Sequence, residues 1–220
     1  MKKTIVAIIA FTVIFASCNS TGNKTETNDA DTVKTVINES TVTFNKIEEG
    51  SYLNWTAFHL GRTSKRFGKV FLKDAEILVN ENKVSNATIT VDMLSLTVEN
   101  FDEGDPKIEK LKSHLLDNDF FKTETYPTSK FELTNTEPSD KDGYAYIFTG
   151  NLTILETTKS ISFYANANID GDKINIHSEE FTIDRTDWNL TYNTEGTEGV
   201  AKDYLIANDV IFKIDITLSK

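Results

Sequence analysis

The sequence predicts a mostly β protein, a barrel or sandwich of about eight or nine antiparallel strands with one helix. Most segments after residue 41 alternate apolar and polar residues with period 2, which is the pattern of half-buried strands. Turn signals separate these segments, and one segment changes to helical spacing. Many short, evenly spaced strands favour a barrel or a sandwich, and a barrel of about eight strands can hold one small ligand.

The first residues predict an export signal. Lys2 and Lys3 precede an apolar run over 4–15, and small residues follow just before Cys18, the single cysteine of the chain. The run is shorter than the roughly 20 residues that cross a bilayer. Small residues before a cysteine resemble the lipobox of bacterial lipoproteins, which implies a signal peptide over 1–17 and a lipidated Cys18. The alternative is an ordinary secretory signal with an incidental cysteine.

The next segment predicts a tether and sets the domain boundary. Residues 19–40 are polar, rich in Thr, Asn and acids, and lack apolar periodicity, so we expect a flexible tether over 18–40 and one folded domain over 41–220. The formal charge of the chain is -11, and loss of 1–17, with two lysines and no acid, makes it -13. This charge argues against nucleic acid binding through broad basic patches.

The strand segments can be followed in chain order. They cover 51–60, 68–79, 83–94, 129–135, 144–155, 161–170, 173–185 and 210–220. The last is the clearest, because one face carries Val210, Phe212, Ile214, Ile216 and Leu218. Glu81-Asn82, Asp142-Gly143 and Asp170-Gly171 mark turns between neighbouring strands.

The segment 105–121 is the predicted helix. Asp105 is placed to cap it, with Pro106 at the first helical position. Ile108, Leu111 and Leu115 then fall on one face at helical spacing.

The sequence offers no clear catalytic, metal or cofactor site. His59, His114 and His177 have no metal-ligand spacing, although a site assembled from all three in space remains an alternative. We find neither a nucleophile elbow nor a glycine-rich phosphate loop. We therefore predict a non-enzymatic protein without a cofactor.

Arg185 and a cluster of three other basic residues each have two open interpretations. Arg185 in FTIDRTDWNL is either a structural cation, paired with an acid such as Asp187 or stacked on Trp188, or a cation near a ligand headgroup. Arg62, Lys65 and Arg66 lie in one connection between strands, which is either the mouth of a cavity or a solvated loop.

Several motifs, taken in order, resemble the YceI-like family, the periplasmic polyisoprenoid-binding proteins. They are SYLNWTAFH, VDMLSLTVEN, LKSHLLDNDFFKTETYPTSKFELTN, GNLTILETTKSISF, FTIDRTDWNL and the alternating end of the chain. Asp119, Phe120 and Phe121 match the D-F-F motif, Tyr126-Pro127 the Y-P motif, and Arg185 with Asp187 the R-x-D motif. Glu156 and Asn189 depart from the family, which usually has Gly at both positions.

This resemblance implies an extended antiparallel barrel of about eight strands, lipocalin-like, with one helix packed across it. It implies an apolar interior for an isoprenoid chain, with Arg185 and Asp187 as headgroup or structural charges. The ligand contacts that we predict from it are Trp55, Phe71, Met93, Leu115, Phe120, Phe131, Phe148, Phe163, Phe181, Trp188 and Phe212.

The first functional hypothesis is therefore binding, storage or transport of a polyisoprenoid or isoprenoid quinone in the cell envelope. The lipidated N-terminus would be anchored in the outer membrane or face the periplasm, and a homodimer is possible. One alternative is a stress-protection or interaction lipoprotein with a filled barrel. Another is an enzyme that acts on an apolar substrate.

Overall fold

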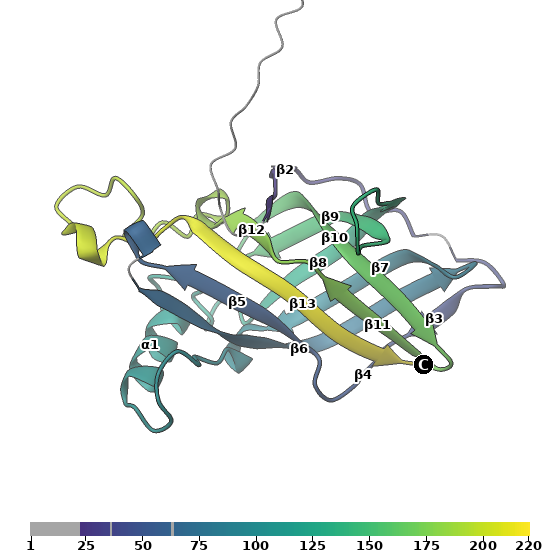
Figure 1. Ribbon diagram of the computed structural model, residues 1–220, viewed down its shortest axis with the longest axis horizontal. Coiled ribbons are helices and arrows are strands. Elements are labelled where there is room, and N and C mark those ends of the chain that lie inside the picture. Colours follow the sequence, from purple (N-terminus) through teal and green to yellow (C-terminus); the bar gives the residue numbers. More distant parts are fainter. Residues whose placement is uncertain (1–22, 36, 63) are drawn as a thin grey trace, which may run out of the picture.

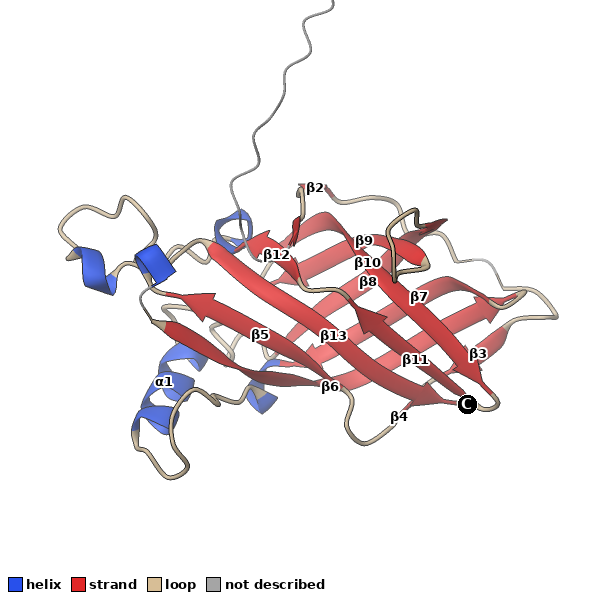
Figure 2. Ribbon diagram, viewed as in Figure 1, coloured by secondary structure: helices blue, strands red, loops and turns tan. Residues whose placement is uncertain are grey.

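The computed structural model describes residues 23–35, 37–62 and 64–220, so the predicted signal peptide and Cys18 lie outside the described residues. Within these ranges the chain forms thirteen strands in one sheet, one α-helix and four short 3-10 segments (Figure 2). The strands are β1 (Asn23–Lys24), β2 (Asn28–Asp29), β3 (Val42–Phe44), β4 (Lys46–Ile47), β5 (Tyr52–Phe58), β6 (Lys65–Asn80), β7 (Lys83–Asp92), β8 (Thr128–Pro138), β9 (Tyr146–Ile154), β10 (Thr157–Asp170), β11 (Lys173–Ser178), β12 (Phe181–Asp184) and β13 (Asp209–Ser219). The helical segments are η1 (Leu60–Arg62), η2 (Met93–Ser95), α1 (Lys107–Leu116), η3 (Arg185–Trp188) and η4 (Lys202–Tyr204). None of the described helices is long and apolar enough to cross a membrane.

Eight of the strands close into an antiparallel ring (Figure 1). Each strand from β5 to β11 pairs with the next one in the chain, and β13 pairs with both β11 and β5 to close the ring. The predicted mostly β barrel of about eight strands with one helix is confirmed. The predicted segment 173–185 forms both β11 and β12, which follow one another along β13.

The turns between strands have the backbone that their residues predict. Glu81 and Asn82, between β6 and β7, have φ of 50° and 63°, which is the pattern of a type I′ hairpin turn. Gly171, between β10 and β11, has φ of 58°.

Helix α1 begins at Lys107, one residue after the predicted first helical residue Pro106, which is its N-cap, and it ends earlier than predicted. The Asp105 carboxylate accepts a hydrogen bond of 2.9 Å from the Lys107 amide, as a helix cap does. The helix ends at Leu116 and not at Phe121, because the next residues turn back onto it. The amide of Phe121 donates to the Leu115 carbonyl over 3.1 Å, and Lys122 has φ of 46°. The D-F-F residues therefore lie in a turn.

Residues 23–31, which we call the strap, lie against the barrel. The sequence predicts a flexible tether over 18–40, but β1 pairs with β12 and β2 pairs with β10. The Asn151 side chain exchanges hydrogen bonds of 2.8 and 2.7 Å with the backbone of Asp31. Ser160 donates to the Asp31 carboxylate over 3.0 Å. These outward polar side chains of β9 and β10 are buried because the strap covers them.

The barrel interior has two different halves. One is a packed core of buried apolar side chains: Phe44, Ile77, Val79, Val84, Ala165, Ile174, Ile176 and Leu218. The other contains a cavity. Leu111 and Leu115 of α1 line this cavity, so the helix marks the hollow half. The helical segments also gather toward one end of the molecule (Figure 2).

Candidate functional site: an apolar cavity and its polar mouth

The cavity has a volume of about 210 Å³. Four polar residues contribute to its lining, His59, Arg66, Ser129 and Arg185, and every other lining residue is apolar. A preformed cavity with few polar groups is typical of sites for apolar ligands.

Most of the predicted contact residues come together here. Those that line the cavity are Trp55, Met93, Leu115, Phe120, Phe131, Phe163, Phe181 and Phe212. They come from β5, η2, α1, the following turn, β8, β10, β12 and β13. Their contact with a ligand remains a prediction.

Three other predicted contact residues lie outside this lining. Phe71 is 37% exposed and packs edge-on against Tyr52, because it points to the outer face of β6. Phe148 is buried and stacks on Tyr146, at a centroid distance of 5.9 Å. Trp188 is fully buried, and its indole N–H donates to the Leu152 carbonyl over 2.9 Å.

Aromatic rings form one continuous wall of the cavity. Phe163 lies 5.6 Å from Phe131 and 4.8 Å from Phe181, measured between ring centroids, and the second pair is stacked at 13°. Phe181 in turn lies 6.1 Å from Phe212. The wall thus crosses four strands, each of which contributes one inward ring.

Gly150 of β9 makes room for this wall. A Cβ atom at Gly150 would lie 2.4 Å from the ring of Phe131 and 2.6 Å from the Glu132 carbonyl oxygen. The sequence interpretation missed this glycine. It also missed aliphatic lining residues such as Leu152, Ile161 and Ile183, although the same alternation marks their inward faces.

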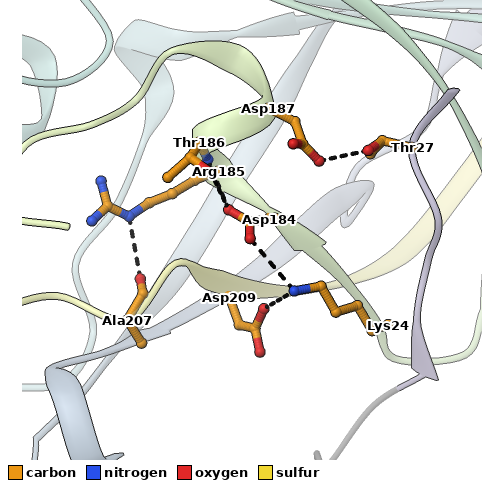
Figure 3. Close-up of polar contacts among 8 residues, drawn as sticks. All are labelled: Lys24, Thr27, Asp184, Arg185, Thr186, Asp187, Ala207 and Asp209. Atoms are coloured by element: carbon orange, nitrogen blue, oxygen red, sulfur yellow. Dashed lines mark hydrogen bonds and ion pairs between the residues drawn. The ribbon is translucent and has the colours of Figure 1, made fainter. Parts of the chain in front are cut away.

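Arg185 is a buried cation held by backbone carbonyls. It is 4% exposed, and its guanidinium donates to Ala207 (3.2 Å), Tyr192 (3.0 Å), Ile206 (3.2 Å) and Leu190. Burial lowers the pKa of Arg185 below its ordinary value, and the charge of the nearby Asp184 carboxylate offsets only part of this effect. The side chain therefore holds the segment after η3 and the segment before β13 together, as a structural arginine does. Figure 3 shows the contact with Ala207.

The acids beside Arg185 bind the strap (Figure 3). The Thr27 hydroxyl donates to Asp187 over 2.6 Å. Lys24 donates to Asp209 over 2.9 Å and lies 3.5 Å from Asp184. Burial raises the pKa of Asp184, but hydrogen bonds from the Thr186 hydroxyl and amide, with the charge of Lys24, outweigh it and leave that pKa below its usual value.

A second, polar pocket of about 520 Å³ adjoins the cavity, and we call it the outer pocket. Its lining consists of His59, Arg66, Phe101, Lys107, Lys110, Leu111, Ser113, His114 and Asp117. His59, Arg66 and Leu111 line both spaces, so the cavity and the outer pocket adjoin beside α1.

Cations outnumber acids in the outer pocket, although the chain as a whole is acidic. Arg66 donates to the Ser64 hydroxyl over 2.6 Å, and its guanidinium lies 5.3 Å from the Phe101 ring centroid. Of the three basic residues that the sequence places in one connection, Arg66 thus lies at the mouth. An anionic or polar headgroup is compatible with such a pocket.

The described residues contain no group of three metal-ligating side chains. His59 lies 2.8 Å from the Asp203 carbonyl oxygen, His114 lies 3.0 Å from an Asp119 carboxylate oxygen, and His177 belongs to β11. The alternative of a site built from all three histidines therefore finds no support in the geometry.

Comparison with known proteins identifies the fold family. A sequence model of the YceI-like domain matches residues 27–218. The chain belongs to the YceI-like family. It is 38% identical to a UPF0312 protein of Photorhabdus laumondii over 92 residues, which cover 42% of this chain and 40% of that protein. The match thus spans about two fifths of that relative.

Two solved structures share the YceI-like fold. A polyisoprenoid binding domain from Saccharophagus degradans, described as implicated in plant cell wall breakdown, aligns with a TM-score of 0.59 at 15% identity, over 81% of this chain and 99% of that domain. BcnA of Burkholderia cenocepacia aligns with a TM-score of 0.54 at 19% identity, over 76% of this chain and 95% of that one.

The two departures from the YceI-like pattern have structural explanations. Asn189 has φ of 61°, a conformation that Gly adopts freely and that Asn tolerates best among other residues. Its side-chain NH₂ group also donates to the Thr157 hydroxyl over 2.9 Å. Glu156 accepts a hydrogen bond of 3.2 Å from the hydroxyl of Tyr126, the tyrosine of the Y-P motif.

Proposed function

We propose that this protein binds, stores or carries an isoprenoid lipid, with the apolar tail in the cavity and the headgroup toward the outer pocket. The observation that carries the proposal is the almost wholly apolar cavity in the hollow half of the barrel. Burial of a hydrocarbon tail is favourable by about 25 cal/mol per Å² of apolar surface removed from water. Binding of this kind needs no reacting side chain, so the proposed role is not enzymatic.

The cavity volume sets an expectation for the ligand. At about 210 Å³ it exceeds the cavity of roughly 150 Å³ that binds benzene in an engineered protein. Since one isoprene unit has nearly as many carbons as benzene, the cavity as it stands accepts about one or two units. A longer chain requires lining side chains to move, or must extend into the outer pocket.

The relatives and the first residues support this function. The Saccharophagus degradans domain that shares the fold is named for polyisoprenoid binding. The predicted signal peptide and Cys18 support a lipid-anchored protein of the cell envelope. A tail-binding barrel held at a membrane would receive its ligand from the bilayer that dissolves it.

The alternative is an interaction or stress-protection lipoprotein with a filled barrel. The packed half of the interior agrees with that alternative. The cavity in the other half favours a lipid ligand.

The direct test is native mass spectrometry of the Cys18→Ser protein, followed by lipid extraction. We expect an adduct with the mass of an isoprenoid lipid, either as purified or after incubation with polyprenyl phosphates and quinones. A bare protein mass under all these conditions would contradict the proposed function.

A substitution in the lining makes the test specific. Ala57 of β5 lines the cavity next to His59, so Ala57→Trp should fill the space and abolish binding of farnesol. Ala57→Ser leaves the space open and should retain binding. Comparison of farnesol with farnesyl phosphate then measures the contribution of the outer pocket: tighter binding of the phosphate that disappears in high salt indicates an electrostatic headgroup contact.

A further inference from the structure

The barrel wall divides on the side that the strap covers. β10 and β11 pair from Ala165 to Asp170, and β13 continues past β11 to pair with β12. Among the described residues, the remaining edge of β12 pairs with β1 of the strap, and the free edge of β10 before Ala165 pairs with β2. The strap therefore occupies the place where β10 and β12 would otherwise face each other.

Thr25 connects both edges. Its amide donates to the Thr182 carbonyl of β12 over 2.8 Å. Its hydroxyl donates to the Ser162 carbonyl of β10 and accepts from the Ser162 amide over 3.3 Å. Thr25 thus contacts β12 through its backbone and β10 through its side chain.

The divided region lies over the hollow half of the barrel. Ile161 and Phe163 of β10, and Phe181 and Ile183 of β12, all line the cavity. The stacked rings of Phe163 and Phe181 close the wall from inside, and the strap closes it from outside. The described lining residues of the cavity include none from the strap.

Fixed contacts bound this region at both ends. The Glu179 amide donates to the Tyr164 carbonyl over 3.0 Å at one end. Asn189 binds Thr157 at the other. Between them, residues 158–163 of β10 extend about 20 Å at about 3.3 Å per residue.

The strap is held by contacts that open at low cost. No strap residue belongs to the buried apolar core of the described chain, and the Lys24 side chain is 51% exposed. Segments with few buried apolar contacts open locally at a free energy far below that of global unfolding. Release of the strap therefore leaves the ring of eight strands paired.

We propose that the strap is a removable part of the cavity wall, and that its release opens a lateral portal between β10 and β12 through which an apolar chain enters. A hydrocarbon chain packs at about 4 Å from the atoms on either side, so its entry requires the stacked rings of Phe163 and Phe181 to rotate apart. The portal rests on the proposed function, because it serves the same cavity. It differs from the outer pocket in having apolar side chains along both edges.

The position of the strap suits entry from a membrane. Asn23 lies five positions after Cys18 in the sequence, and five extended residue steps span at most about 18 Å. A lipid on Cys18, as proposed above, would thus hold the start of the bound strap within that distance of the bilayer surface.

A disulfide between strap and barrel tests the portal. Asp29 and Lys159 are directly paired residues of β2 and β10, so Asp29→Cys with Lys159→Cys has the backbone spacing of a disulfide. The matched control is Lys130→Cys with Thr153→Cys, a directly paired position of β8 and β9. Both pairs are made in the Cys18→Ser background, which has no other cysteine.

The measurement is the stopped-flow uptake rate of the apolar fluorescent dye N-phenyl-1-naphthylamine. The oxidised strap disulfide should slow uptake by about tenfold or more, since it blocks a local opening, and reduction should restore the rate. The control disulfide should leave the rate unchanged. Thr25→Val, which keeps the side-chain shape and removes the hydroxyl, should accelerate uptake and increase hydrogen exchange at the Ser162 amide.

The outcomes separate the two proposals. Equal uptake rates for the oxidised and reduced strap disulfide would overturn the portal and leave the cavity function intact, with entry through the outer pocket. Absence of dye and farnesol binding in every variant would overturn the proposed function and the portal with it.

Discussion

Replacement of Arg185 by Met tests whether this cation is structural. Met keeps an unbranched apolar stem but removes four hydrogen bonds to the carbonyls of Leu190, Tyr192, Ile206 and Ala207. A hydrogen bond contributes about 1 kcal/mol net, so four predict a loss of about 4 kcal/mol in the free energy of unfolding. This agrees with the roughly 3–5 kcal/mol lost when one partner is removed from a buried charged network.

The assay is urea unfolding of the Cys18→Ser protein with and without Arg185→Met. The midpoint should fall while the m value stays constant, because the exposed surface changes little. The urea midpoint of Arg185→Lys should lie between those of the other two proteins, because one ammonium group lacks the planar fork of donors that reaches four carbonyls.

A loss below about 1 kcal/mol would refute the structural interpretation of Arg185. The informative companion result is farnesyl phosphate binding to the same variants. Weaker binding with nearly unchanged stability would make Arg185 a headgroup contact instead.

Two further predictions follow from the packing and the charges. Gly150→Ala should lower the free energy of unfolding by about 1–3 kcal/mol in urea unfolding, because the new methyl group forces the Phe131 ring toward the cavity. For the same reason it should reduce dye binding. A free energy of unfolding equal to that of the parent protein would show that the backbone adapts. Attachment of the strap, measured as the protection factor of the Ser162 amide against hydrogen exchange, should be constant near neutral pH. The folded-state pKa of Asp184 lies below its ordinary value of 3.8, so its contribution is present above that pH and is lost as the pH falls through the lower folded value. The pKa of Lys24 is raised above 10.5 by its hydrogen bond to Asp209, so its contribution is complete below that pH and is lost as the pH rises through the folded value. A protection factor at the Ser162 amide that changes strongly between about pH 6 and 8, after division by the base-catalysed intrinsic exchange rate, would contradict this assignment of the contacts.

The strand faces were predictable because they depend on local alternation. Every ring strand coincides with a period-2 segment of the sequence, and the hydrogen bond that Asp105 accepts from the Lys107 amide at the start of α1 is equally local. The end of α1 was not predictable from apolar spacing, because the turn after Leu116 depends on hydrogen bonds that fold the following residues back onto the helix.

The role of the strap required the tertiary structure. Residues 23–31 have no apolar periodicity, which alone indicates a flexible tether. Their binding sites are polar side chains more than a hundred residues away, such as Asn151, Ser160 and Asp187. Local sequence carries no signal for such contacts.

The sequence by itself determined that the chain alternates into a β barrel with one helix, and its ordered motifs indicated the YceI-like family. Only the tertiary structure decided which inward residues surround empty space. Val210, Phe212 and Ile214 of β13 line the cavity, whereas Ile216 and Leu218 on the same face of the same strand belong to the core beyond it. Alternation fixes the side of the sheet to which a residue points, but the space it meets depends on side chains from the other strands and from α1.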